Sequence, residues 1–374
     1  MKILIVFGTR PEAIKMAPLV LKLKADARFK TRVCVTGQHK EMLNQVLQAF
    51  DIKPDYRLDV MRPNQTLQSM TSEILSKVDD VLIDFMPDMI LVHGDTTTTM
   101  ATSLAAYYRK ISVGHIEAGL RTKNIYSPWP EEGNRKIVGA LAAQHFAPTK
   151  WAKSNLLKEG VPEAFIHVTG NTVIDALKMT INRLSEDVKL AAKIESELNV
   201  NLKRNIILIT GHRRENFGEG FNNICDAIKI SSIKNPDYLY IYPVHLNPQV
   251  REPVLNKLAN LDNVLLKEPL DYLPFVYLMS KSKIILTDSG GIQEEAPSLG
   301  KPVLLMRETT ERPEAVKEAN VKMVGTDIKK IASAIDELIQ NKDKYEDMSR
   351  ISHAYGDGNA AGKIIEILAS LNNV

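Results

Sequence analysis

The chain has 374 residues, of which 44% are hydrophobic and 25% are charged, and its formal net charge is +3. This is the composition of a globular protein large enough to form two hydrophobic cores. The weak positive charge is not gathered into a Lys/Arg stripe, so nucleic acid is not an expected partner, whereas an anionic small molecule is. Two distant cysteines, Cys34 and Cys225, argue against both a disulfide framework and a zinc site.

The start of the chain favours a strand over a targeting or membrane segment. The sequence MKILIVFGTRP has about five apolar residues before Gly8, fewer than the roughly 7 to 15 of a signal peptide. No apolar run approaches the length of about 18 residues that a membrane helix requires, so we expect no membrane partner. We therefore expect a cytoplasmic protein.

Short apolar runs alternate with segments of helical periodicity throughout. Strands are predicted at residues 2–7, 31–36, 88–93, 112–116, 144–147 and 165–169, and then at 205–210, 238–244, 263–267, 283–287, 302–306 and 321–324. Many of them are continuous Ile, Val and Leu runs, which are typical of parallel strands buried on both faces. The alternation predicts an α/β protein with two Rossmann-like, doubly wound domains.

A long helical segment, TVIDALKMTINRLSEDVKLAAKIESELN, separates the two sets of strands. We therefore predict an N-terminal domain over residues 1–168 and a C-terminal domain over residues 169–374. Open parallel sheets bind ligands outside the carboxyl ends of their strands. The residues that follow each strand are accordingly the candidates for a functional site.

Three acids of the first half follow strand ends or begin the next helix. Asp95 lies in HGDTTTT, Glu117 in HIEAGLRT and Glu131 in SPWPEEGNR. Each acid alone has a structural interpretation: Asp95 as a helix cap, Glu117 as the ion-pair partner of Arg121, and Glu131 as a helix-start charge. Their convergence on one strand-end cleft favours acid–base chemistry.

A metal site is a weaker interpretation of the same stretch. His93 and Asp95, and likewise His115 and Glu117, have a spacing that metal ligands also use. Residues i and i+2 share a face only while a strand continues, and Gly94 and the strand ends interrupt it. We therefore expect neither a metal nor a cofactor.

The stretch DSGGIQEEAPSLGKP is the strongest candidate in the second half. Ser289 is predicted to cap a helix, Gly290 and Gly291 allow the backbone to approach a ligand, and free N–H groups at a helix start suit a phosphate. Glu295, in the first turn, is expected either to bind ribose hydroxyls or to complement the helix dipole. His212 lies just past another strand. The chain has no Walker A loop, and no G-x-G-x-x-G follows its first strand.

Ten motifs, taken together, identify a family. They are FGTRPEAIKMAPL, HGDTTTT, GHIEAGLRT, YSPWPEEGNR, GNTVIDAL, GHRRENFGEG, YPVHLNP, DYLPFVYLM, DSGGIQEEAPSLGKPVL and TTERPEAV. From Met1 to about residue 370 the chain closely resembles the non-hydrolysing UDP-N-acetylglucosamine 2-epimerases of bacteria. The resemblance implies a GT-B-like architecture with a deep interdomain cleft, a homodimer, and a last helix, at about residues 360–374, that crosses back to the first domain.

The resemblance also implies a reaction, the reversible interconversion of UDP-N-acetylglucosamine and UDP-N-acetylmannosamine for cell-surface polysaccharide synthesis. In this family UDP leaves by anti elimination, which gives 2-acetamidoglucal, and then adds back in a syn sense. Such chemistry needs a positioned base for the C2 proton and cationic groups for the departing diphosphate. Which acid removes the proton on each face is left open.

Matched motif by motif, the resemblance assigns roles to single residues. The catalytic residues would be Asp95, Glu117, Glu131, His212 and Lys15. Substrate would be bound by Arg10, Arg135, Phe275, Ser289, Gly290, Gly291, Glu295 and Arg312. Many bacterial members are activated by UDP-N-acetylglucosamine bound beside the active site, which here would involve Gln38, His39, Gln65, Arg213 and His245.

The acidic pair in SPWPEEGNR receives an asymmetric interpretation. We expect Glu131 and Arg135, at i and i+4, to face the site together, and Glu132 to be only a helix-start charge. Replacing Glu132 is therefore expected to have little effect.

Three other functions remain as alternatives. A hydrolysing epimerase, which releases UDP and free N-acetylmannosamine, would share the acids and the fold. A GT-B glycosyltransferase would need an acceptor, and a retaining one would need fewer clustered acids. A catalytically silent nucleotide-sugar sensor is disfavoured by the intact acids and His212.

Overall fold

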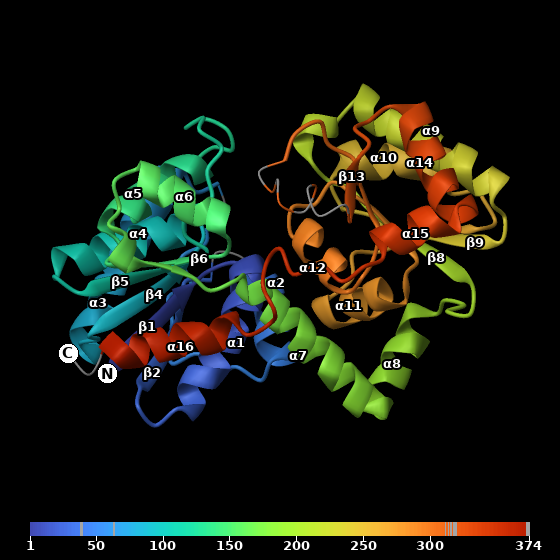
Figure 1. The fold of residues 1–374 in the computed structure, drawn as a ribbon. Helices are drawn as coiled ribbons and strands as arrows, with labels where there is room; N and C mark the ends of the chain where they lie inside the picture. Colours follow the sequence, from blue (N-terminus) through green and yellow to red (C-terminus); the bar gives the residue numbers. More distant parts are fainter. Residues whose placement is uncertain are drawn as a thin grey trace. The chain divides into compact units, whose positions relative to one another are not determined.

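The computed structural model describes residues 1–37, 40–62, 64–310, 312, 314, 316 and 320–371. The chain divides into two compact units, both visible in Figure 1. Unit 1 comprises Met1–Met179 together with the C-terminal segment from Tyr355, and unit 2 comprises Thr180–Ala354. The units divide inside helix α7 (Thr172–Glu186), which begins after the boundary predicted at residues 168–169.

Unit 1 is built on a seven-stranded parallel sheet in the order β3-β2-β1-β4-β5-β6-β7. Its strands are β1 (Lys2–Phe7), β2 (Lys30–Val35), β3 (Tyr56–Arg57), β4 (Met89–His93), β5 (Ser112–Ile116), β6 (Gln144–Ala147) and β7 (Ile166–Val168). The strands predicted for this half are therefore confirmed. The two-residue strand β3 was not predicted, because it contains no apolar run.

Helices cover both faces of this sheet. They are α1 (Arg10–Ala25), α2 (Lys40–Ala49), α3 (Leu67–Phe85), α4 (Thr97–Tyr108), α5 (Glu131–Leu141), α6 (Lys150–Lys158), the first part of α7, and α16 (Ala360–Leu371), with a short 3-10 helix at Glu163–Phe165. Leu4 and Val6 of β1 pack in one core with α3 and α4. Ile3 and Ile5, which point the opposite way, are fully buried on the face that α1 contacts.

Unit 2 repeats this plan on a six-stranded parallel sheet in the order β10-β9-β8-β11-β12-β13. The strands are β8 (Asn205–Thr210), β9 (Tyr238–Pro243), β10 (Val264–Lys267), β11 (Ile284–Thr287), β12 (Val303–Leu305) and β13 (Val321–Met323). All six were predicted. In both sheets the strand order reverses direction beside the first strand, which is the topological switch point of a doubly wound fold.

The helices of unit 2 are α8 (Val188–Leu198), α9 (Glu219–Lys234), α10 (Pro248–Leu258), α11 (Tyr272–Lys281), α12 (Ile292–Ser298), α14 (Ile328–Gln340) and α15 (Lys342–Met348), with a 3-10 helix at Arg214–Asn216. Helices α9, α10 and α14 share a core with Ile207 and Ile209 of β8. Helices α11 and α12 contact strands β8 and β12, respectively. The predicted α/β class with two Rossmann-like halves is thus confirmed, while the interdomain cleft stays a prediction.

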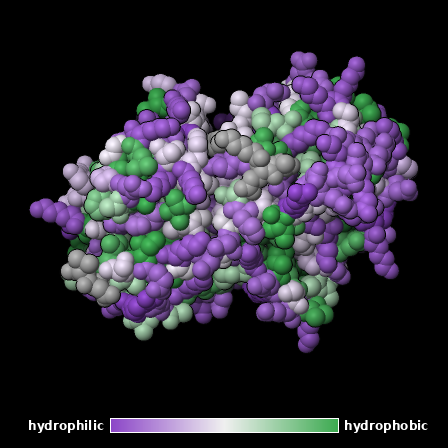
Figure 2. All heavy atoms as spheres, viewed as in Figure 1, coloured by the Kyte–Doolittle hydropathy of each residue, from purple (hydrophilic) through white to green (hydrophobic). Residues whose placement is uncertain are grey.

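The long helical segment between the two sets of strands is two helices. Asp187 ends α7 and caps α8, where its side chain accepts the N–H of Leu190 at 2.9 Å. Among the described residues, no helix combines the length and the apolar character needed to cross a bilayer. Hydrophilic side chains cover most of the face shown in Figure 2.

The C-terminal helix α16 is attached to α7 by a buried carboxylate. Asp175 accepts the N–H groups of Ala360 and Ala361 at 3.1 and 2.9 Å, so it caps α16. Burial raises the pKa of Asp175, although these hydrogen bonds oppose the rise. The last helix therefore packs in unit 1, beside α1.

Candidate functional site

In unit 1 the carboxyl ends of β4 and β5 lie side by side. His93, the last residue of β4, pairs in register with Ile116 of β5, so Asp95 and Glu117 follow neighbouring strands as predicted. Glu117 adopts a left-handed backbone with a φ of 61°. A side chain other than Gly pays about 1–3 kcal/mol for that conformation, and such strain is concentrated at functional sites.

Polar side chains from three other segments of the chain lie around the Glu117 carboxylate. Lys15 of α1 forms an ion pair with its Oε2 atom, and the Nδ2 of Asn171, just after β7, donates to the same oxygen at 2.7 Å. His93 Nε2 lies 3.8 Å from it. Because the Glu117 side chain is only 8% exposed, these partners hold it in one position, as a catalytic base requires.

Arg135 of α5 joins two carboxylates. Its Nη2 lies 2.5 Å from Asp95 Oδ2 and its Nη1 lies 2.9 Å from Glu132 Oε2. Glu132 has no exposed surface, and it also accepts the N–H groups of Thr122 and Lys123, each at 3.2 Å. Glu132 does lie in the first turn of α5, as predicted, but the expectation that it is only a helix-start charge is wrong. It is a buried partner of Arg135 at i, i+3.

Glu131, the first residue of α5, has a different environment. Its Oε2 atom is buried and has no hydrogen-bond partner among the described residues. The expected pairing of Glu131 with Arg135 is thus replaced by the Glu132 ion pair. A buried, unpaired carboxylate oxygen is costly to the fold, so it calls for an explanation, and a ligand that supplies the missing donor is one.

The two histidines of this region are buried and neutral. Burial lowers the pKa of His93 to about 4 and that of His115 to about 3. His115 Nε2 lies 2.7 Å from the Gly94 carbonyl oxygen, a strand-end hydrogen bond rather than a ligand geometry. Within the described ranges, no three His, Cys, Asp or Glu side chains are grouped as a metal site.

The other predicted residues of unit 1 are Arg10 and Gln65, together with Gln38 and His39. Arg10 is the half-buried first residue of α1. Gln65 donates to Glu73 at 3.2 Å, and its Oε1 accepts the backbone N–H of Arg62 at 3.3 Å. Gln38 and His39 lie outside the described residues.

In unit 2, Asp288 organises the turn after β8. Its Oδ2 accepts the backbone N–H groups of His212 and Arg213 at 2.9 and 2.8 Å, and its Oδ1 lies 3.6 Å from His212 Nδ1. The ring of His212 stacks on that of His245, with centroids 5.5 Å apart. Burial lowers the pKa of His212, and the Asp288 charge opposes this shift.

The glycine turn before α12 brings two arginines to one backbone. A Cβ atom added to Gly290 would lie 2.7 Å from Arg312 Nη1 and 3.3 Å from Arg213 Nη2. Arg312 is itself held by Glu294 at 2.5 Å. Two guanidinium groups beside a glycine backbone suit a diphosphate, because Arg binds phosphate oxygens in a bidentate manner.

The predicted cap at Ser289 is wrong. Helix α12 begins at Ile292, Gly291 holds the N-cap position, and no side chain caps the helix. The Ser289 N–H instead donates to the Thr287 side chain at 3.0 Å. The turn is two residues longer than the sequence pattern predicted, so the Ser289 hydroxyl does not cap the helix.

Two further predicted residues of unit 2 lie on α11 and α12. Glu295 is 8% exposed, and the hydroxyl of Tyr272 donates to it at 3.3 Å. Phe275 is half-buried on α11, the helix that also carries Tyr272. These residues can offer a carboxylate and an aromatic face to a nucleoside.

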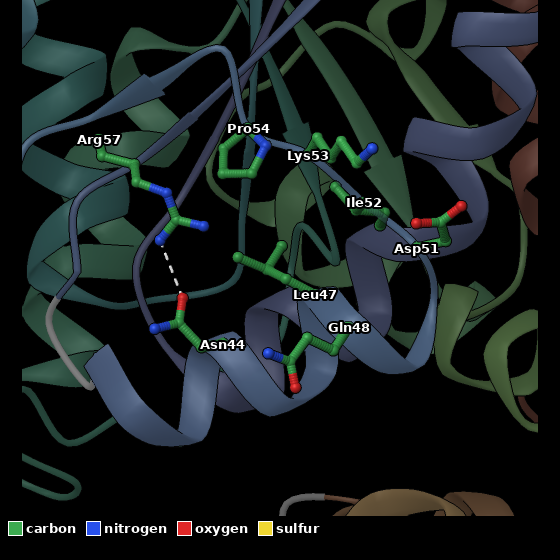
Figure 3. Close-up of a pocket in the computed structure, with 8 residues that line it drawn as sticks. All are labelled: Asn44, Leu47, Gln48, Asp51, Ile52, Lys53, Pro54 and Arg57. Carbon is green, nitrogen blue, oxygen red and sulfur yellow. Dashed lines mark hydrogen bonds between the residues drawn. The ribbon is translucent and has the colours of Figure 1, made fainter.

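A surface pocket with a volume of about 480 Å³ is lined by residues of α2 and of the chain that follows it, in unit 1. Figure 3 shows how its lining residues lie. Its lining residues are Asn44, Leu47, Gln48, Asp51, Ile52, Lys53, Pro54 and Arg57. Arg57 donates to Asn44 at 2.9 Å. The lining includes no predicted site residue, so this pocket is not part of the candidate site.

Three residues with contacts to the site, Asn171, Asp288 and Glu12, were not singled out from the sequence, and a fourth, Glu132, was considered only as a helix-start charge. Asp288 directly follows β11 and Asn171 comes three residues after the end of β7, so the strand-end rule that found Asp95 also applies to them. Glu12 and Glu132 gave no such signal, because each lies in the first turn of a helix, where acids are common for electrostatic reasons alone.

Comparisons with known proteins agree over nearly the whole chain. The family model described as UDP-N-acetylglucosamine 2-epimerase matches residues 21–369. A probable UDP-N-acetylglucosamine 2-epimerase of Ralstonia nicotianae is 59% identical over 97% of both chains, and the Salmonella typhimurium enzyme is 55% identical over 99% of both. The crystal structure of the Neisseria meningitidis enzyme bound to UDP-GlcNAc has a TM-score of 0.93 and 54% identity, covering 99% of this chain and 100% of that one.

Proposed function

The chain belongs to the UDP-N-acetylglucosamine 2-epimerase family, and from this premise we propose that it interconverts UDP-N-acetylglucosamine and UDP-N-acetylmannosamine without net hydrolysis. One observation carries the proposal. Asp95, Glu117 and Glu131 lie at the ends of two neighbouring strands and at the start of α5, in three different environments. An epimerase must move a proton on both faces of one carbon, and several distinct carboxylates serve that need.

The chemistry follows from these environments. A carboxylate takes the C2 proton, the C1–O bond breaks, and UDP departs with the bonding electrons, leaving a C1=C2 double bond. UDP then adds back to C1 while C2 is protonated on the opposite face. Glu117, held by Lys15 and Asn171, and Glu131, with its unpaired oxygen, are supported as the two proton-transfer groups; Asp95, bound to Arg135, is supported as their electrostatic partner.

The residues of unit 2 suit the nucleotide. We assign Gly290, Arg312 and His212 to the diphosphate, where negative charge accumulates as UDP leaves. Glu295 and Phe275 are assigned to ribose and uracil, and Ser289 and Gly291 to the phosphate turn. Arg10 is assigned to the diphosphate from unit 1.

Incubation with UDP-N-acetylglucosamine in deuterated water, followed by NMR, tests the function. We expect deuterium at C2 of both sugars and no accumulation of UDP. Free UDP with N-acetylmannosamine would indicate the hydrolysing alternative, and UDP release only with an added acceptor would indicate a glycosyltransferase. Binding without any change in the sugar would leave a nucleotide-sugar sensor.

We also propose activation by UDP-N-acetylglucosamine at a second site that includes Gln38, His39, Gln65, Arg213 and His245. The stacking of His245 on His212 supports this, because it connects an assigned regulatory residue to a catalytic one. The test is the initial velocity with UDP-N-acetylmannosamine alone, which should be low and should rise on addition of trace UDP-N-acetylglucosamine. Full velocity from the start would contradict activation.

The setting of the reaction completes the proposal. We propose a cytoplasmic homodimer that supplies N-acetylmannosamine units to cell-surface polysaccharide synthesis. The domains are taken as residues 1–168 and 169–374, with the helix at about residues 360–374 returning to the first. Light scattering of the purified chain tests the dimer.

A further inference from the structure

Glu12, in the first turn of α1, is buried and joins two loops. Its Oε2 accepts the backbone N–H groups of Gly8 and Thr9, after β1, at 3.0 and 2.8 Å. Its Oε1 accepts the Thr96 hydroxyl, after β4, at 2.7 Å and lies 3.2 Å from the Thr99 hydroxyl. The residue is 2% exposed. One carboxylate therefore ties together the turns that follow two adjacent strands.

A residue assigned to the reaction lies close to each of these turns in sequence. Asp95 directly precedes Thr96, so the bond from Thr96 to Glu12 fixes the backbone beside Asp95. Lys15 lies one turn beyond Glu12 on α1, where it binds Glu117. The separation of Lys15 from Asp95 thus depends on the bridge that Glu12 makes.

A helix cap alone does not account for this arrangement. Thr9 and Glu12 form a capping box, which needs only the one carboxylate oxygen that accepts the N-cap N–H. The other oxygen is directed to hydroxyls of another element, 84 and 87 residues away in sequence. Burial raises the pKa of Glu12, and the hydrogen bonds from Thr96 and Thr9 oppose this rise. A buried carboxyl group is costly without partners, and here three groups donate to it, the N–H groups of Gly8 and Thr9 and the Thr96 hydroxyl. The Thr99 hydroxyl has its shorter contact with the His93 carbonyl oxygen, at 2.6 Å.

We propose that Glu12 is a positioning residue for the epimerisation, in that it holds the β1–α1 turn with Lys15 and the β4–α4 turn with Asp95 in register. It touches no reacting atom. The inference rests on the proposed function and adds to it a residue that acts through two others.

Two substitutions of Glu12 distinguish the effect of its hydrogen bonds from the effect of its side-chain volume. In Glu12→Gln the amide oxygen still accepts the Gly8 and Thr9 N–H groups, and its NH₂ group can donate to the threonine hydroxyls, which also accept. Glu12→Met has similar length and no hydrogen bonds. We expect Glu12→Gln to keep kcat within about fivefold of wild type and Glu12→Met to lower kcat about 100-fold, with KM changed less than threefold.

Asp175→Asn is the matched control, because Asp175 is also a buried carboxylate that accepts two backbone N–H groups in unit 1, but it caps α16 instead of a turn of the site. We expect it to lower the melting temperature while kcat stays within threefold. A second pair, Thr96→Val and Thr96→Ser, breaks or keeps the cross-loop bond while Glu12 remains in place, which covers the case in which Glu12→Met does not fold. Thr96→Val should lower kcat about tenfold and Thr96→Ser should not.

The outcomes distinguish the inference from the function on which it rests. Wild-type kcat in Glu12→Met and in Thr96→Val, or equal losses in Asp175→Asn at a matched melting temperature, would overturn the positioning role alone. Absence of deuterium incorporation by the wild-type protein would overturn the proposed function and the inference with it.

Discussion

Arg135 binds Glu132, and not Glu131: Arg135 Nη1 lies 2.9 Å from Glu132 Oε2, on a carboxylate with no exposed surface. The other end of the guanidinium holds Asp95. Two adjacent acids at the start of one helix therefore differ in whether their carboxylates are paired. Glu132 is fully paired inside the protein, whereas Glu131 keeps a buried oxygen without a partner among the described residues.

The first prediction concerns Glu132→Gln. Loss of this charge leaves Arg135 buried with only one carboxylate and weakens the bonds to the Thr122 and Lys123 N–H groups. Breaking a buried ion pair costs about 3–5 kcal/mol, and because the amide keeps part of the hydrogen bonding we expect a loss near the lower value. Thermal unfolding should show a clearly lower melting temperature. An unchanged melting temperature would indicate that Glu132 is not an essential partner of Arg135.

The second prediction is the opposite result for Glu131→Gln. This side chain has a buried oxygen with no hydrogen bond to lose, and the substitution removes an unpaired buried charge, so the melting temperature should not fall. Turnover should fall by about 10²–10⁴-fold, the usual contribution of a proton-transfer group. The two variants share one helix turn and one chemical change, so each is the control for the other. Retained turnover in Glu131→Gln would exclude it as a proton-transfer group.

The third prediction separates the two glycines of the α12 turn. A Cβ at Gly290 would lie 2.7 Å from Arg312 Nη1, whereas a Cβ at Gly291 would meet Glu295 Oε2 at an ordinary 3.8 Å. Gly290→Ala should displace a flexible guanidinium without unfolding the chain and weaken UDP binding about tenfold, the loss of roughly one charge-assisted contact. Gly291→Ala leaves the Arg312 guanidinium in place, so it should bind UDP more tightly than Gly290→Ala does. Titration calorimetry with UDP decides, and equal affinities for both variants would remove Arg312 from the diphosphate assignment.

Local sequence pattern predicted the features that depend on local chemistry. The strands of both sheets are apolar runs, and Asp95 and Glu117 were found because parallel strands end at one edge. Hydrogen-bond and ion-pair partners that a loop brings together could not be predicted from the local sequence. Arg135 pairs with Glu132 and not with Glu131 because the turn at Thr122 and Lys123 returns to α5. The N–H groups of this turn hold the Glu132 carboxylate in place.

Long-range partners were missed for the same reason. The bond of Glu12 to Thr96 spans 84 residues, and a first-turn acid has a sufficient local explanation in the helix dipole. Asp175 likewise reads as part of a helix, yet it caps α16 from 185 residues away. In each case the position of the acid within a helix is a sufficient explanation at the level of sequence. The buried hydrogen bonds to a distant segment become evident only from the packing of the fold.

The last prediction is a pH dependence of stability that originates at His145, on β6. Burial lowers the pKa of His145 to about 4, against about 6.5 in an unfolded chain. The unfolded state therefore takes up a proton first as the pH falls. The neutral ring contributes its full stability above pH 6.5, and this contribution is lost between about pH 6.5 and 4, at up to about 1.4 kcal/mol per pH unit.

The measurement is the difference between wild type and His145→Gln, which has no titrating ring at this position. Raised pKa values, as at Glu12 and Asp175, act in the opposite sense, but they are present in both proteins and cancel in the difference. Between pH 7 and pH 5 we expect the variant to gain about 2 kcal/mol relative to wild type, whatever its stability at pH 7. Urea unfolding at pH 7, 6 and 5 gives this difference. If the stability of the two proteins changed equally with pH, His145 would have the same pKa in the folded and unfolded chains. Its burial would then make no contribution to the pH dependence of stability.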